Sequence, residues 1–186
     1  RRRIALGLAG EHNVMNALAA AAAAHAAGAG IEAIVDGLTS MRAVTGRLEM
    51  RPAHAGARMI DDSYNANPAS LRAGLRALSS VPGRHWLVLG EMRELGAESA
   101  RLHAEMGEFA RQTGVARLLA VGDDAHHAVE AFGTGATWFA SVDDMIAALR
   151  AELGPDVTVL VKGSRSNRLE RVSAALASAA VAGAGH

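Results

Sequence analysis

From about residue 48 onward, short apolar segments alternate with helical segments, and this alternation constrains the fold most strongly. Strand-like patterns occur at residues 46–53, 57–63, 85–90, 116–122, 136–140 and 157–163. Helical patterns occur at residues 68–80, 99–114, 125–132, 142–154 and 167–180. Strands and helices that alternate at this spacing predict an α/β fold, with a mostly parallel sheet and helices on both faces. No helix separates the first two strands, so we expect them to form an antiparallel hairpin at the edge of the sheet.

The first 48 residues have a different organisation. Residues 1–10 alternate like a strand, residues 11–28 read as a helix ended by Gly28, and residues 30–41 read as a second helix. The apolar residues of the second helix recur at helical spacing: Ile31, Ile34, Val35 and Leu38. One strand and two helices are too little to bury a core alone. We therefore expect residues 1–48 to be the end of a preceding domain and residues 49–186 to form the α/β domain.

Composition excludes several classes of protein. The 19 basic and 19 acidic residues balance, whereas a protein that binds nucleic acid or a membrane surface would show a basic stripe. Cysteine is absent, which excludes disulfides and thiolate metal sites and fits a reducing compartment. No apolar run has membrane-spanning length. We expect a cytoplasmic globular protein, and its low aromatic content of 3% predicts that helices pack through small side chains.

The segment MIDDSYNANPAS, residues 59–70, concentrates polar side chains where a predicted strand ends. Ligands of open α/β sheets bind outside the carboxyl ends of the strands. Six polar residues, more than a turn requires, lie here: Asp61, Asp62, Ser63, Tyr64, Asn65 and Asn67. Asn67 precedes Pro68 and suits a helix N-cap. For some of the others we favour ligand binding, because carboxylates accept hydrogen bonds from ribose hydroxyls and amides bind peptide backbone; the alternative is that Asp61, Asp62 and Ser63 only form the turn.

A second polar group, in VLVKGSRSNR, places Lys162, Ser164 and Arg165 between a predicted strand and a helix. Unpaired N–H groups at a helix start, together with two cations, favour a carboxylate or phosphate. The alternative is an ordinary turn in which Ser164 or Ser166 caps the helix and the cations lie in solvent.

Weaker signals come from two further segments. LGEMRELG carries Glu94 after another strand, and His103 follows one helical turn into the next helix. GEHNVMN places His12 beside Asn13, and Asn13 and Asn16 share one face of a helix start. Two neighbouring amides can read the edge of a purine base, although Asn13 can equally be a cap.

The eight histidines show no metal-binding spacing. His126 and His127 are adjacent in a predicted helix, where neighbouring residues are expected to point apart. We therefore predict no metal site formed by this chain.

Read together, these segments resemble the Mur ligases. GEHNVMNALAAAAAAHAAG, the pair Gly46–Arg47, DDSYNANP, LGEMRELG with a following LH, and VKGSR occur in that family's order, from about residue 4 to residue 176. DDSYNANP is the most specific of these segments. In it the chain resembles the family member that joins D-Ala-D-Ala to UDP-MurNAc-tripeptide through an acyl phosphate. The resemblance implies a Rossmann-like C-terminal domain preceded by a helical remnant of the central ATP-binding domain. It also implies a monomer that uses ATP and Mg²⁺ and binds both substrates.

The resemblance also assigns roles to residues. Asn13 and Asn16 would contact adenine, and Arg47 and Asp62 would lie near the ribose and phosphates. The remaining residues would face the dipeptide and the reacting phosphate: Tyr64, Asn65, Asn67, Lys162, Ser164 and Arg165.

One departure from the family concerns lysine. Lys162 is the sole lysine, so this chain holds neither the family's Gly-Lys-Thr/Ser phosphate loop nor its second, carbamylated lysine. We therefore expect these 186 residues to be catalytically inactive alone. Two alternatives are a receiver-like signalling domain, with Asp61, Asp62, Glu91 and Lys162 as its polar site, and a stand-alone module that binds nucleotide or peptide.

Overall fold

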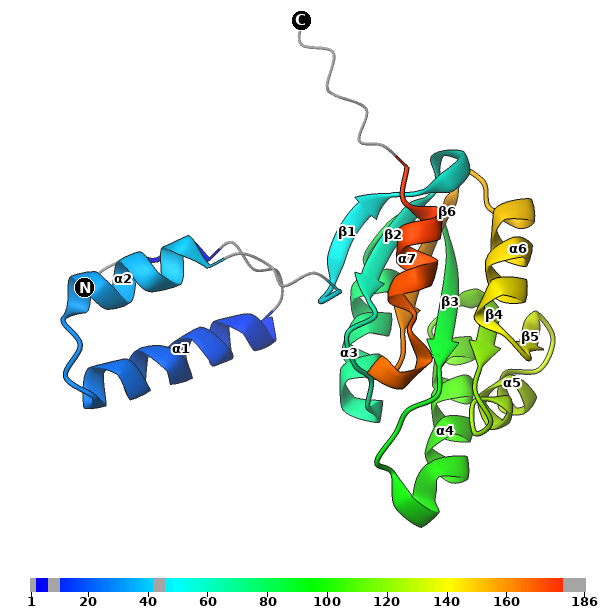
Figure 1. Cartoon of the computed structure of the whole chain (residues 1–186), viewed down its shortest axis with the longest axis horizontal. Helices are drawn as coiled ribbons and strands as arrows, with labels where there is room; N and C mark the ends of the chain where they lie inside the picture. The colour runs from blue at the N-terminus through cyan, green and yellow to red at the C-terminus, as the bar shows by residue number, and fades with distance from the viewer. Residues whose placement is uncertain (1–2, 7–10, 42–45, 179–186) are drawn as a thin grey trace, which may run out of the picture. The chain divides into compact units, whose positions relative to one another are not determined.

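The computed structural model of the chain describes residues 3–6, 11–41 and 46–178. The chain divides into two compact units, Arg1–Val44 and Thr45–His186, and each is described here by itself (Figure 1).

The first unit contains two helices, as predicted. α1 (Glu11–Ala26) and α2 (Ile31–Ser40) pack through a small cluster that includes Ala17, Ile34 and Leu38. Ile34 and Leu38 are buried, whereas Ile31, at the first position of the helix, is exposed. The expected strand is not present in residues 3–6, and residues 7–10 lie outside the described residues.

The second unit is built on a six-stranded sheet with the order β1-β2-β6-β3-β4-β5. Its strands are β1 (Glu49–Pro52), β2 (Arg58–Asp62), β3 (Arg84–Gly90), β4 (Val115–Val121), β5 (Ala136–Phe139) and β6 (Val157–Lys162). Only the β1–β2 pair, at the edge, is antiparallel, and the four other pairs are parallel. The predicted α/β sheet with an antiparallel edge hairpin is confirmed.

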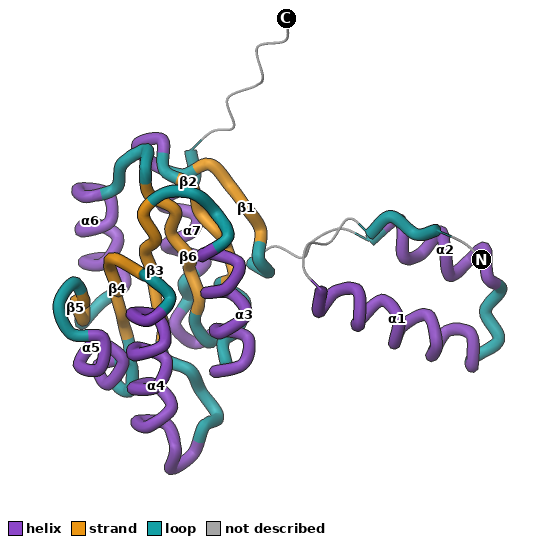
Figure 2. Tube along the Cα trace, turned by 180° about the vertical axis from the view of Figure 1, so that it is seen from behind, coloured by secondary structure: helices purple, strands orange, loops and turns teal. Residues whose placement is uncertain are grey.

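Helices cover both faces of this sheet (Figures 1 and 2). The core on one face includes residues of α3 (Pro68–Ser79), α4 (Ser99–Gln112) and α5 (His126–Phe132), and the core on the other includes residues of α6 (Val142–Glu152) and α7 (Glu170–Leu176). Successive strand residues alternate between the two cores: Leu87 and Leu89 face α3–α5, whereas Trp86 and Val88 face α6 and α7. This alternation is the period of two that buries both faces of a strand.

The chain connections around the inner strand β6 predict a crevice at the carboxyl ends of the strands. The chain leaves β6 toward α7 on one face, whereas it leaves the neighbouring strands β2 and β3 toward α3 and α4 on the other face. Neighbouring strands whose connections diverge in this way open the crevice in which α/β proteins bind ligands. Among the described residues, the helices all fall short of the length and hydrophobicity that crossing a bilayer requires.

Candidate functional site

A buried ion pair joins the ends of β2 and β6. Asp62 and Lys162 are direct partners in the parallel register, and the Lys162 Nζ donates to Asp62 Oδ2. Lys162 also donates to the carbonyl of Asn65, 3.0 Å away, and Asp62 Oδ1 accepts from the Leu48 N–H at 3.2 Å. The pair therefore ties the polar turn after β2 and the segment before β1 to the middle of the sheet.

Burial raises the pKa of the Asp62 carboxyl above its ordinary value and is the largest influence on it. The Lys162 ammonium and, more weakly, the Leu48 N–H lower this pKa. Lys162 is only 2% exposed. An ammonium held this deep acts mainly on the protein groups that it contacts. Lys162, a predicted site residue, thus contacts the turn that carries Tyr64 and Asn65 and helps to position it.

The loops after β3 and β6 are held together by hydrogen bonds in which Ser164 and Asn167 contact backbone groups. Ser164 Oγ accepts from the Arg93 N–H at 2.8 Å, and the Ser164 N–H donates to the Glu91 carbonyl at 3.2 Å. Asn167 donates from Nδ2 to the carbonyls of Glu91 and Ser164, at 2.8 and 3.0 Å. Ser164 therefore holds the β3–α4 loop, and it does not cap a helix with its side chain. The role of Asn167 was not predicted, although its position within the GSRSN segment is a signal for it.

His103, a weaker candidate, is fully buried in α4. Its Nδ1 donates to the Ser99 carbonyl at 2.8 Å, and its Nε2 accepts from the Met92 N–H at 2.9 Å. Because one ring nitrogen donates and the other accepts, the imidazole is the neutral Nδ1–H tautomer. His103 thus fixes the loop after β3 and presents no free nitrogen to a ligand.

An open pocket of about 420 Å³ lies over these loops. Its lining comes from three chain segments: Tyr64–Asn67, Arg93–Leu95 and Ser164–Ser166. The charged side chains among these are Arg93, Glu94 and Arg165, and all three are exposed. Two guanidiniums and one carboxylate around a polar pocket suit a small ligand that carries both a negative and a positive group.

A second pocket, of about 470 Å³, lies beside the first and shares Tyr64 and Arg165 with it. Two guanidiniums approach the Tyr64 ring: the Arg47 Cζ lies 4.6 Å and the Arg165 Cζ 5.8 Å from its centroid. Tyr64 is 42% exposed, so these cations meet its ring at the protein surface. Cation–π contacts of this kind hold the guanidiniums in place while their N–H groups stay available to an anion.

Glu94 has a strained backbone at the pocket, with φ of 66°. A left-handed conformation costs a residue with a side chain roughly 1 kcal/mol or more, whereas glycine adopts it freely. We predict that Glu94→Gly stabilises the second unit by about 0.5 kcal/mol, after the greater freedom of glycine in the unfolded chain is subtracted. Urea denaturation measures the change. Glu94→Ala keeps the strain and is the control, so equal stability of the two variants would contradict the prediction.

The other predicted residues fall into two groups. Asn67 forms a capping box with Ser70, accepting from its N–H at 2.8 Å, so the predicted N-cap is confirmed. Asn65 uses its Oδ1 to accept from the Ala66 N–H and keeps its side-chain NH₂ at the exposed rim. In the first unit, Asn13 is half-buried and Asn16 is exposed, both on α1. The side chain of His12 lies outside what the structure describes.

Comparison with known proteins identifies relatives of this chain. The family model described as "Mur ligase, glutamate ligase domain" matches residues 46–165. The chain is 42% identical to the UDP-N-acetylmuramoyl-tripeptide–D-alanyl-D-alanine ligase of Escherichia coli, over 93% of this chain and 38% of that protein. The ligase of the same name from Mycobacterium tuberculosis is 39% identical, over 93% of this chain and 39% of its own length. The chain thus spans about two fifths of the length of these relatives.

Solved structures give a consistent result. A crystal structure of MurF from Acinetobacter baumannii has a TM-score of 0.78 at 35% identity and covers 92% of this chain and 39% of its own. The MurF ligase of Thermotoga maritima, in complex with ADP, has a TM-score of 0.72 at 25% identity and covers 89% of this chain and 38% of its own.

Proposed function

Because the chain belongs to the Mur ligase family, we propose that it serves the ATP-dependent joining of D-Ala-D-Ala to UDP-MurNAc-tripeptide through an acyl phosphate. In this proposal residues 49–186 are the C-terminal domain of the ligase, and residues 1–48 belong to its ATP-binding domain. The observation that carries the proposal is the identity with ligases of this name along nearly the whole chain. The family assignment also rejects the receiver alternative. A monomeric, cytoplasmic protein is part of the same proposal.

The first pocket suits the dipeptide. D-Ala-D-Ala is a small zwitterion, and the pocket offers the guanidiniums of Arg93 and Arg165 for its carboxylate and Glu94 for its amino group. Arginine binds a carboxylate with two parallel hydrogen bonds, which fixes orientation as well as position. The free NH₂ of Asn65 can donate to the peptide carbonyl, and the Asp62–Lys162 pair holds the turn that presents it.

The rim near Tyr64 suits the phosphates. Arg47 and Arg165 place two cations against one exposed ring, which fits a polyanion such as ATP or an acyl phosphate. Both oxygens of Asp62 already accept hydrogen bonds from the chain, so any contact that it makes with a ribose uses their remaining lone pairs. Asn13 and Asn16 are proposed to contact adenine. When bound, ATP supplies the phosphoryl group that activates the tripeptide carboxylate, and we assign no residue of this chain to Mg²⁺.

A titration with dipeptide tests this proposal. We predict that D-Ala-D-Ala shifts the NMR amide signals of Tyr64–Asn67, Arg93–Leu95 and Ser164–Ser166, and that L-Ala-L-Ala does not. Arg165→Ala removes a charge-assisted contact and is expected to weaken binding by about tenfold or more. Arg150→Ala, at an exposed position of α6, is the matched control. Equal shifts with both dipeptides, or none at these amides, would contradict the pocket assignment.

A further inference from the structure

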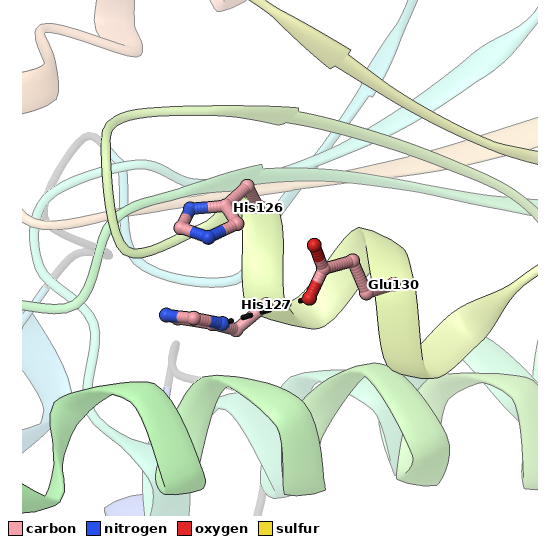
Figure 3. Close-up of side chains that lie close together, drawn as sticks. All are labelled: His126, His127 and Glu130. Atoms are coloured by element: carbon pink, nitrogen blue, oxygen red, sulfur yellow. Dashed lines mark ion pairs between the residues drawn. The ribbon is translucent and has the colours of Figure 1, made fainter.

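Three potential metal ligands lie together on α5, although the sequence predicts no metal site. The ring centroids of His126 and His127 are 3.9 Å apart, and the Glu130 carboxylate lies one helical turn further on (Figure 3). One ligand atom from each of the three lies within 4.8 Å of the others. The expectation that the two adjacent histidines point apart is wrong, because their side-chain rotamers bring both rings to one side of the helix start.

We propose that His126, His127 and Glu130 bind a divalent transition-metal ion such as Zn²⁺. Ligand atoms around a tetrahedral zinc are separated by about 3.4 Å, given metal–ligand distances near 2.1 Å. His127 Nδ1 and Glu130 Oε2 are already 3.7 Å apart. All three side chains are at least partly exposed. Small side-chain rotations therefore bring one ligand atom from each to bonding distance of a shared metal ion.

The ring of His126 is held in a tautomer that suits a metal ligand. Its Nδ1 contacts the carbonyl of Asp123, and a carbonyl only accepts, so Nδ1 carries a proton and, in the neutral ring, Nε2 has the free lone pair. A backbone carbonyl that orients a histidine in this way is the usual second partner of a metal-binding imidazole. This contact is present without a metal, and it leaves Nε2 of His126 as the ligand atom.

The backbone beneath the cluster is closely packed against α4. Ala125 and Ala128 are fully buried, and α5 approaches α4 so closely that a side chain at Gly107 would meet the Ala128 carbonyl. Ligands on a rigid element need little reorganisation when the metal binds. None of the three cluster residues lines either pocket described above, so this site is separate from the proposed dipeptide and phosphate sites.

The ligand set indicates the class of metal. Two imidazoles and one carboxylate suit zinc, nickel or copper, whereas Mg²⁺ prefers oxygen ligands only. Three protein ligands also leave a coordination position open to water or another group.

Isothermal titration calorimetry of the chain with zinc chloride tests the site. An excess of magnesium chloride is present throughout the titration. One binding event is expected. His127→Ala and Glu130→Gln should each weaken it by at least about tenfold, because even the loss of an outer-shell partner typically costs that much. His25→Ala, an exposed helical histidine of α1, is the matched control and should leave the affinity unchanged. Circular dichroism verifies that each variant is folded.

NMR of the histidine rings locates the metal. Zinc should shift the Nε2 signal of His126 and leave its Nδ1 protonated. No zinc binding in the presence of excess magnesium, or equal weakening by His25→Ala and His127→Ala, would overturn the proposal. These outcomes are independent of whether the dipeptide binds.

Discussion

Replacing Gly107 with alanine is expected to destabilise the second unit by about 2 kcal/mol or more, although alanine is the better helix former. A Cβ at Gly107 would lie 2.1 Å from the carbonyl oxygen of Ala128 and 2.8 Å from its Cα. These are backbone atoms of α5, so no side-chain rotation relieves the overlap and the two helices must separate. Their separation opens the buried contact between α4 and α5, and this loss exceeds the gain of roughly 1 kcal/mol in helix propensity.

Gly74→Ala is the matched control for this prediction. Gly74 also lies inside a helix, but a Cβ there would meet side-chain atoms and no backbone: the Leu160 methyl groups at 3.1 and 3.6 Å, and Asp62 Oδ2 at 3.7 Å, which is ordinary van der Waals contact. These methyl groups can move by a few tenths of an ångström, so the propensity gain should offset most of the cost. Urea denaturation followed by the fluorescence of buried Trp86 measures both variants in the second unit. A loss in Gly107→Ala no larger than that in Gly74→Ala would contradict the prediction.

This close contact illustrates what the sequence predicts and what it does not. The shortage of aromatic residues predicts close packing through small side chains, and Gly107 against Ala128 is one case of it. The strands and helices were predicted because apolar residues recur with clear periods of two and 3.6. No such period identifies which glycine of a helix faces a neighbouring backbone, since that depends on the angle and register at which two helices cross.

At the candidate site, too, the sequence predicts local features but not tertiary contacts. Strand ends were recognisable from the sequence, so the polar residues at Asp62 and Lys162 were correctly expected at one edge of the sheet. Their direct pairing was not, because it depends on β6 lying between β2 and β3, an order that local pattern does not encode. His103 is a weak candidate from the sequence because it follows the polar LGEMRELG segment, one helical turn into the next helix. Its burial against the Met92 N–H is a tertiary contact that spacing alone does not reveal.

The ion pair of Asp62 and Lys162 contributes to stability through charge. Lys162→Met is expected to destabilise the second unit by about 3 kcal/mol near neutral pH, because Asp62 is left as a buried carboxylate without its cation. Methionine fills a similar volume, so the loss reflects mainly the charge. The pKa of Asp62, already raised by burial, should rise further, since the Lys162 ammonium is the largest influence that lowers it.

The sign of the pH dependence separates this explanation from a packing defect. A carboxyl whose pKa is higher in the folded state than in the unfolded state favours folding at low pH, and that contribution is lost as pH rises through the folded pKa. The difference in stability between Lys162→Met and the unsubstituted chain should therefore be smaller near pH 4, about the ordinary pKa of aspartate, than at neutral pH. The double variant Asp62→Asn/Lys162→Met should recover most of the loss at neutral pH, since it contains neither charge. A loss that is the same at both pH values, or one that the double variant does not reduce, would show that Lys162 stabilises the fold by packing and not by neutralising Asp62.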